Sequence, residues 1–228
     1  MLNFKKLDFT FDPVKLQEAL KQVNAIVEFP KILVEKTPMK KEIYINSDKI
    51  CHQLCLTKRK GDIAPNYYYV QAEQKGEVKK YDNTIENSNW EKDENHKEFE
   101  YTELIPEFRE TYFKDVYEKI SAWAKTHDCL LGRARLRLSH PYTCLSWHQD
   151  DQPNIHIPII TNKSSRIVIE DEMLHMPAGE VWFANVTERH TQFNAGHNER
   201  IHLVVSIKHK EFKSEYEKNK NKTNIYNS

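Results

Sequence analysis

Two histidines and one aspartate are the residues of this chain best suited to chemistry. His148 and Asp150 stand two apart in SWHQDDQPNIHIP, and His190 follows in FANVTERHTQFN. Residues i and i+2 of a strand share a face, so we expect His148 and Asp150 to point the same way. Two imidazoles and one carboxylate form a facial triad with open coordination positions, an arrangement suited to non-haem Fe(II) and oxygen. We therefore predict a metal site here, in preference to ordinary polar residues of a strand edge and a loop.

Arg200 opens the apolar run RIHLVVSIK, ten residues after His190. A guanidinium is always charged and forms a planar fork that can hold a carboxylate through two hydrogen bonds. We predict that Arg200 clamps a carboxylate; the alternative is a surface ion pair with Glu199 or Glu188. His202 shares the strand face of Arg200, and we expect it to pack there.

Three further arginines, Arg133, Arg135 and Arg137, alternate with apolar residues in GRARLRL and should share one strand face. Three guanidiniums are costly to bury without partners, so this face either meets solvent or binds anions. A nucleic-acid partner is disfavoured, because no aromatic residues are interleaved and the formal net charge is zero.

The composition favours one polar, globular chain. Among 228 residues, 39% are apolar and 30% charged, which permits a core beneath a very polar surface. We expect no signal peptide and no membrane span, because no apolar run is long enough. The four cysteines show no zinc or disulfide spacing, so we expect free thiols in the cytoplasm.

Apolar periodicity separates a mixed N-terminal half from a C-terminal half of strands. Helical spacing predicts helices over 12–27 and 105–128, with a long polar loop at 74–100 between them. Turn residues then separate short strands, which indicates a sandwich or barrel. The expected strands are 132–140, 154–160, 165–172, 180–186 and 200–208. Trp147, Trp182 and Phe183 are expected to pack in the core.

The stretch from His140 to Lys208 resembles the iron- and 2-oxoglutarate-dependent oxygenases, in the branch of the aspartyl/asparaginyl β-hydroxylases and proline hydroxylases. HPYTCLSWHQD, NIHIPIITN and RIHLVV carry this resemblance. It implies a mainly β (α+β) fold with a double-stranded β-helix core, a cupin-like jelly roll, buttressed by helices from the N-terminal half. A single oxygenase domain would span 1–210, with the jelly roll over 131–210 and a polar tail over 211–228.

The same resemblance assigns roles to single positions. His148, Asp150 and His190 would ligate Fe(II), and Arg200 would pair with the distal carboxylate of 2-oxoglutarate. His156 matches a histidine that lies near the cosubstrate, although a satisfied core histidine is equally compatible. Arg137 is placed near the cosubstrate pocket. Asn154 departs from the pattern, because some members have an arginine there.

The implied activity is hydroxylation of an unactivated C–H bond of an amino acid, free or peptidyl, with O2 consumed and succinate and CO2 released. Alternatives are a non-catalytic sensor of metal and 2-oxoglutarate, and a protein hydroxylase with a macromolecular partner. A cupin-type enzyme without cosubstrate is a further alternative, and it would not need Arg200. The substrate and the oligomeric state stay open at this point.

Overall fold

The structure is a computed structural model, and it describes residues 2–27, 35–36, 42–43, 51–62, 72–74, 90–92 and 98–209. The predicted tail at 211–228 and most of the predicted loop at 74–100 lie outside these residues. Within that loop, the described residues Trp90–Lys92 (β7) pair with Ala72–Gln74 (β6) as a small antiparallel sheet.

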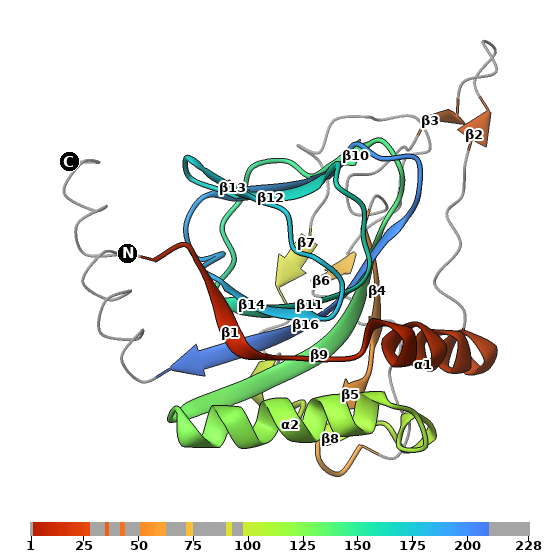
Figure 1. The fold of residues 1–228 in the computed structure, drawn as a ribbon, viewed down its shortest axis with the longest axis vertical. Coiled ribbons are helices and arrows are strands. Elements are labelled where there is room, and N and C mark those ends of the chain that lie inside the picture. The colour runs from red at the N-terminus through yellow and green to blue at the C-terminus, as the bar shows by residue number, and fades with distance from the viewer. Residues whose placement is uncertain are drawn as a thin grey trace.

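Two antiparallel sheets form the centre of the molecule (Figure 1). The large sheet has the order β1-β14-β11-β16-β9-β4, formed by β1 (Phe4–Thr10), β14 (Glu180–Ala184), β11 (Asn154–Ile160), β16 (Arg200–His209), β9 (Cys129–Ser139) and β4 (Cys51–Cys55). The small sheet has the order β10-β15-β12-β13, formed by β10 (Thr143–Cys144), β15 (His190–Asn194), β12 (Ser165–Ile169) and β13 (Glu172–Leu174). From β9 to β16 the chain alternates between the two sheets, apart from the consecutive strands β12 and β13, which both lie in the small sheet. This is the arrangement of a double-stranded β-helix, which confirms the predicted fold class.

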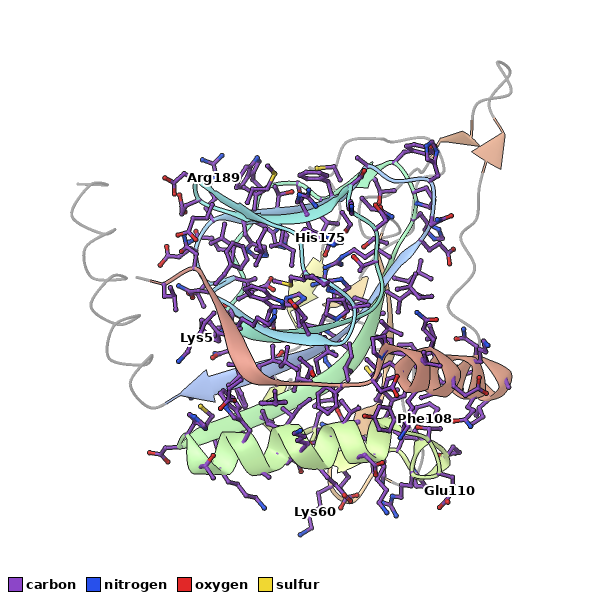
Figure 2. All side chains as sticks on the ribbon, in the orientation of Figure 1. Lys5, Lys60, Phe108, Glu110, His175 and Arg189 are labelled. Atoms are coloured by element: carbon purple, nitrogen blue, oxygen red, sulfur yellow. The ribbon has the colours of Figure 1, made fainter. Side chains whose placement is uncertain are left out.

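Two helices, α1 (Pro13–Ile26) and α2 (Phe113–Thr126), cover the face of the large sheet that points away from the small sheet (Figure 1). Their buried stripes include Leu16, Val23 and Ile120 and join one apolar core with the sheet. Side chains fill the layers between helices and sheet and between the two sheets, and Phe108 lies where the chain enters α2 (Figure 2). Short elements complete the fold: β2 (Glu35–Lys36), β3 (Glu42–Ile43), β5 (Thr57–Lys58), β8 (Glu103–Leu104), η3 (Glu98–Glu100) and η4 (Pro106–Phe108).

The opposite face of the large sheet is polar and buried. The register places His156 opposite Val204, and Val204 opposite Arg135, so these side chains share a face. Arg200 and His202 lie on that same face of β16. The large sheet therefore turns aliphatic residues to the helices and a row of polar residues to the interior of the jelly roll.

Four features of the elements differ from what the sequence predicted. The helix expected over 105–128 begins only at Phe113, because Pro106 starts a separate 3-10 turn. Residues 190–194, where no strand was predicted, form β15, and residues 4–10 form β1. The segment with His148 is not a strand but an extended connection with a single bridge.

The N-terminal strands β1 and β4 pair into the same sheet as C-terminal strands. The single domain over 1–210 stays a prediction. No helix in the described part of the chain is long and apolar enough to cross a membrane.

Candidate metal centre

Backbone pairing places the two predicted histidine ligands next to each other. His190 is the first residue of β15, and His148 lies in the connection between β10 and β11. The two residues form an isolated antiparallel bridge, with N–H to carbonyl distances of 3.0 and 2.9 Å. The backbone N–H of Asp150 donates to the carbonyl of Val186 at 2.9 Å. Three local hydrogen bonds thus fix the segment that carries His148 and Asp150 against the segment that leads into β15.

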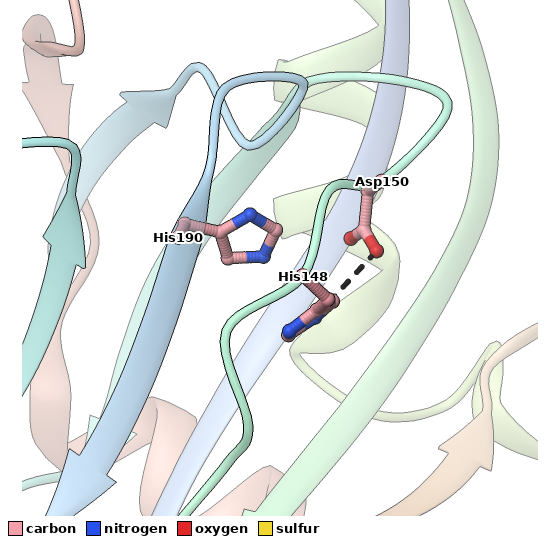
Figure 3. Close-up of side chains that lie close together, drawn as sticks. All are labelled: His148, Asp150 and His190. Atoms are coloured by element: carbon pink, nitrogen blue, oxygen red, sulfur yellow. Dashed lines mark ion pairs between the residues drawn. The ribbon is translucent and has the colours of Figure 1, made fainter.

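The three side chains converge on one point (Figure 3). Their candidate ligand atoms all lie within 4.8 Å of one another. The ring centroids of His148 and His190 are 4.2 Å apart, and the Nε2 atom of His148 is 3.8 Å from the Oδ1 atom of Asp150. His190 is buried, whereas the side chains of His148 and Asp150 are about one-third exposed, at 34% and 31%. The group is therefore anchored on one side and open to a ligand on the other.

Both imidazoles are held through the same ring atom. The Nδ1 atom of His148 lies 2.8 Å from the carbonyl oxygen of Ser146, and that of His190 lies 3.0 Å from the carbonyl oxygen of Glu188. A carbonyl can only accept, so each Nδ1 carries a proton, and in the neutral imidazole this leaves the lone pair of Nε2 for a metal. Histidines that bind metals are commonly oriented by such a hydrogen bond from their other ring nitrogen. The donor set fits a divalent metal of the non-haem iron type.

Burial lowers the pKa of His190, with Asp150 acting in the opposite direction and His148 reinforcing the decrease. Burial disfavours the charged imidazolium. The neutral form is the one that can ligate a metal.

Arg200 lies at 1% exposure in the polar interior, which argues against the surface ion pair considered from the sequence. Its Nη2 atom donates to the Nδ1 atom of His202 at 2.8 Å. Because an arginine cannot accept, His202 must be neutral with its proton on Nε2. Burial first, and then the charge of Arg200, hold the pKa of His202 well below its usual value. His202 therefore orients Arg200, a role that the sequence did not reveal.

In the part of the chain that the structure describes, the interior of the jelly roll contains polar atoms without a hydrogen-bond partner, and a diacid could supply those partners. Among the described residues, neither ring nitrogen of His156 nor the Nε2 atom of His202 has a hydrogen-bond partner, although both side chains are almost fully buried. Their rings meet edge to face with centroids 5.8 Å apart. Buried polar groups are normally paired, so these atoms suit a polar ligand beside Arg200. The residues present fit the carboxylate groups of 2-oxoglutarate.

The arginine row of β9 divides into two parts. Arg133 and Arg135 are buried and pair with Glu98, at 3.0 and 3.2 Å. Their face is thus neither solvent nor a vacant anion site, because a carboxylate of the chain already binds both. Arg137 lies opposite His202 in the sheet, and Ser139 lies opposite Arg200.

Other expectations about single residues had mixed outcomes. Trp147 was expected in the core but is 46% exposed, with the guanidinium of Arg189 over its ring at 5.1 Å. Arg189 lies beside the small sheet (Figure 2). Trp182 is partly buried and packs against Ile167 and its neighbours. Asp151 is exposed, as expected.

Comparisons with known proteins extend these observations. Residues 62–210 match the model of the family described as Aspartyl/Asparaginyl beta-hydroxylase. A comparison with curated protein sequences finds no match.

Two solved structures align with most of the chain. An oxidoreductase of the 2OG-Fe(II) oxygenase family from Burkholderia pseudomallei has a TM-score of 0.49 and 10% identity, covering 90% of this chain and 84% of that chain. A viral collagen prolyl hydroxylase from Paramecium Bursaria Chlorella virus-1 has a TM-score of 0.47 and 8% identity, and the alignment covers 91% of this chain and 97% of that chain. A cupin domain from Bordetella pertussis Tohama I aligns over 34% of this chain and 81% of its own, with a TM-score of 0.30 and 14% identity.

Proposed function

Because this chain belongs to the aspartyl/asparaginyl β-hydroxylase family and is therefore a hydroxylase-type oxygenase, we propose that it uses Fe(II) and 2-oxoglutarate to hydroxylate an amino acid, free or in a peptide. The observation that carries this proposal is the convergence of His148, Asp150 and His190 within 4.8 Å. Two imidazoles and one carboxylate suit a metal that must keep positions open for further ligands.

His148 and His190 would bind the metal through Nε2, and Asp150 through a carboxylate oxygen. When bound, Fe(II) with 2-oxoglutarate and O2 would supply the oxidising power, with succinate and CO2 as the products of the cosubstrate. The protein contributes geometry, because the bridge between His148 and His190 fixes two ligands before any metal arrives.

Arg200 would hold the distal carboxylate of 2-oxoglutarate, since its planar fork matches a carboxylate and His202 fixes its orientation. Arg137 and His156 lie on the same sheet face and would contact the cosubstrate as well. Burial of this face excludes water, which strengthens each charge-assisted hydrogen bond.

The test is an assay of purified protein with Fe(II), ascorbate and 2-oxoglutarate against a panel of amino acids and short peptides. We expect substrate-dependent release of succinate and a product heavier by one oxygen. Absence of both from every reaction, together with absence of 2-oxoglutarate binding, would overturn the proposal.

Arg200→Ala separates this proposal from a cupin-type enzyme without a cosubstrate. We expect the variant to lose succinate release, whereas the matched control Arg59→Ala, which alters an arginine paired with Asp62, retains it. A non-catalytic sensor would bind 2-oxoglutarate but release no succinate with any substrate. A cytoplasmic location, expected from the cysteine pattern, remains a prediction.

A further inference from the structure

We propose that Asn154, Ser206, Arg135 and Glu98 form a directional hydrogen-bond relay that orients the carboxylate of Asp150 toward the metal. This inference rests on the proposed metal site, because it assigns Asn154 as the positioning residue of one predicted ligand. None of the four relay residues was predicted to act on the metal.

The relay consists of contacts between four elements. The Nδ2 atom of Asn154 at the start of β11 lies 3.5 Å from the Oδ2 atom of Asp150. The hydroxyl of Ser206 on β16 donates to the Oδ1 atom of Asn154 at 3.2 Å. The Nη1 atom of Arg135 on β9 donates to that hydroxyl at 3.2 Å and to the Oε1 atom of Glu98 in η3, also at 3.2 Å.

The chemistry of arginine sets the direction of this relay. A guanidinium can only donate, so Ser206 must accept from Arg135 and direct its own proton to Asn154. The amide oxygen of Asn154 is then occupied, and its NH2 group must face Asp150. An ionised carboxylate is purely an acceptor, so the contact at Oδ2 leaves Oδ1 for the metal. Oδ1 is the atom of Asp150 that lies 3.8 Å from Nε2 of His148.

The relay is rigid because it is buried and anchored. Asn154 is 1% exposed and Ser206 is 3% exposed. Glu98 binds Arg133 as well, so two arginines fix its carboxylate. Gly132 permits this close approach, because a Cβ atom there would lie 3.0 Å from Cγ of Glu98 and 3.1 Å from Cβ of Ser206. In a low-dielectric interior, each hydrogen bond of such a network is strengthened by its neighbours.

Metal affinity of the folded protein tests the relay without any assay of turnover. The variants are Asn154→Leu, which keeps the approximate size without the amide, Ser206→Ala and the double variant. Ser165→Ala is the matched control, because Ser165 is equally buried on β12 and its hydroxyl donates to the carbonyl of Phe193, which is no part of the relay. The measurement is Mn(II) titration by calorimetry, with thermal melting of each metal-free protein to show that it is folded.

We expect Asn154→Leu to weaken Mn(II) binding by about 10- to 100-fold, the range typical of residues that orient metal ligands, and Ser206→Ala by about tenfold. The double variant should bind no more weakly than Asn154→Leu alone, because Ser206 acts only through Asn154. Wild-type Mn(II) affinity in both single variants would overturn the relay. The relay would also be overturned if the losses of affinity in the two single variants multiplied in the double variant, or if Ser165→Ala lost as much affinity as they do. Absence of Mn(II) binding by the wild-type protein would instead overturn the metal site and the proposed function with it.

Discussion

At the scale of single residues, Asp150 and its neighbour Asp151 provide an internal comparison. Asp150→Asn removes the charge of the proposed ligand while keeping its shape, and we expect Mn(II) affinity to fall by more than the roughly 10- to 100-fold typical of a surrounding hydrogen-bond partner. Asp151→Asn changes an exposed carboxylate one residue away and should leave the affinity unchanged. Calorimetric titration of both variants checks this, and equal behaviour of the two would remove Asp150 from the metal site.

Arg200→Lys tests the carboxylate clamp, since lysine keeps the charge but loses the planar fork. Hydrogen bonds to charged groups contribute about 1.5–3 kcal/mol, so we expect the dissociation constant of 2-oxoglutarate to rise by about 10- to 100-fold. Mn(II) affinity should stay unchanged, because Arg200 is no part of the triad. Arg59→Lys is the control. A lysine variant with wild-type affinity for 2-oxoglutarate would contradict the proposed role.

Residue types and spacing predicted a group of His148, Asp150 and His190, and their side chains do lie together. Their role as metal ligands and the role of Arg200 as a carboxylate clamp stay predictions. The role of His202 was not predicted, since only the structure shows that its Nδ1 accepts from Arg200. Trp147 was wrongly placed in the core, because local alternation does not tell which side of a short connection meets solvent.

At the scale of elements, α1 shows how one side chain defines where a helix begins. The carboxylate of Asp12 accepts from the backbone N–H of Val14 at 2.8 Å and of Lys15 at 3.4 Å. Asp12→Ala should lower the free energy of unfolding by about 1 kcal/mol, as is typical when an N-cap is lost. Urea denaturation measures this, with Asp8→Ala, an exposed aspartate on β1, as the control. Equal stability of the Asp12 variant and the wild type would show that the cap does not stabilise α1.

The sequence predicted most of the large sheet and the presence of both helices, because their apolar periods are regular. It did not reveal β15, in which Thr191, Gln192 and Asn194 are polar yet buried. Their burial depends on hydrogen bonds to distant residues, such as that of Asn194 to the carbonyl of Ser139, and no local pattern encodes such partners. Pro106 indicates that α2 begins after it, but the apolar residues near Pro106 fit the helical spacing, so the helix was predicted to begin too early.

At the scale of the whole molecule, the buried histidines should make stability depend on pH. Burial, followed by the charge of Arg200, holds the pKa values of His156 and His202 well below the usual value. The unfolded chain therefore binds more protons than the folded protein once the pH falls below about 6.5. We expect the free energy of unfolding of the metal-free protein to decrease as pH falls through this value, by up to about 1.4 kcal/mol per pH unit for each histidine.

Urea denaturation between pH 7.5 and 5, in roughly half-unit steps, measures this dependence, which spans the usual titration range of histidine. His202→Gln should reduce the slope, whereas His127→Gln, a change at an exposed histidine, should not. A slope in His202→Gln identical to that of the wild type would contradict the neutral, buried state of His202.

We propose that one metal held by His148, Asp150 and His190 binds a diacid together with the guanidinium of Arg200. Calorimetric titration of 2-oxoglutarate into the protein, with and without Mn(II) and in the absence of O2, tests both parts at once. We predict tight binding with one molecule per chain when Mn(II) is present, and much weaker binding without it or in Arg200→Lys. Binding that depends on neither the metal nor Arg200, or no binding under any condition, would contradict joint binding of the diacid by the metal and Arg200.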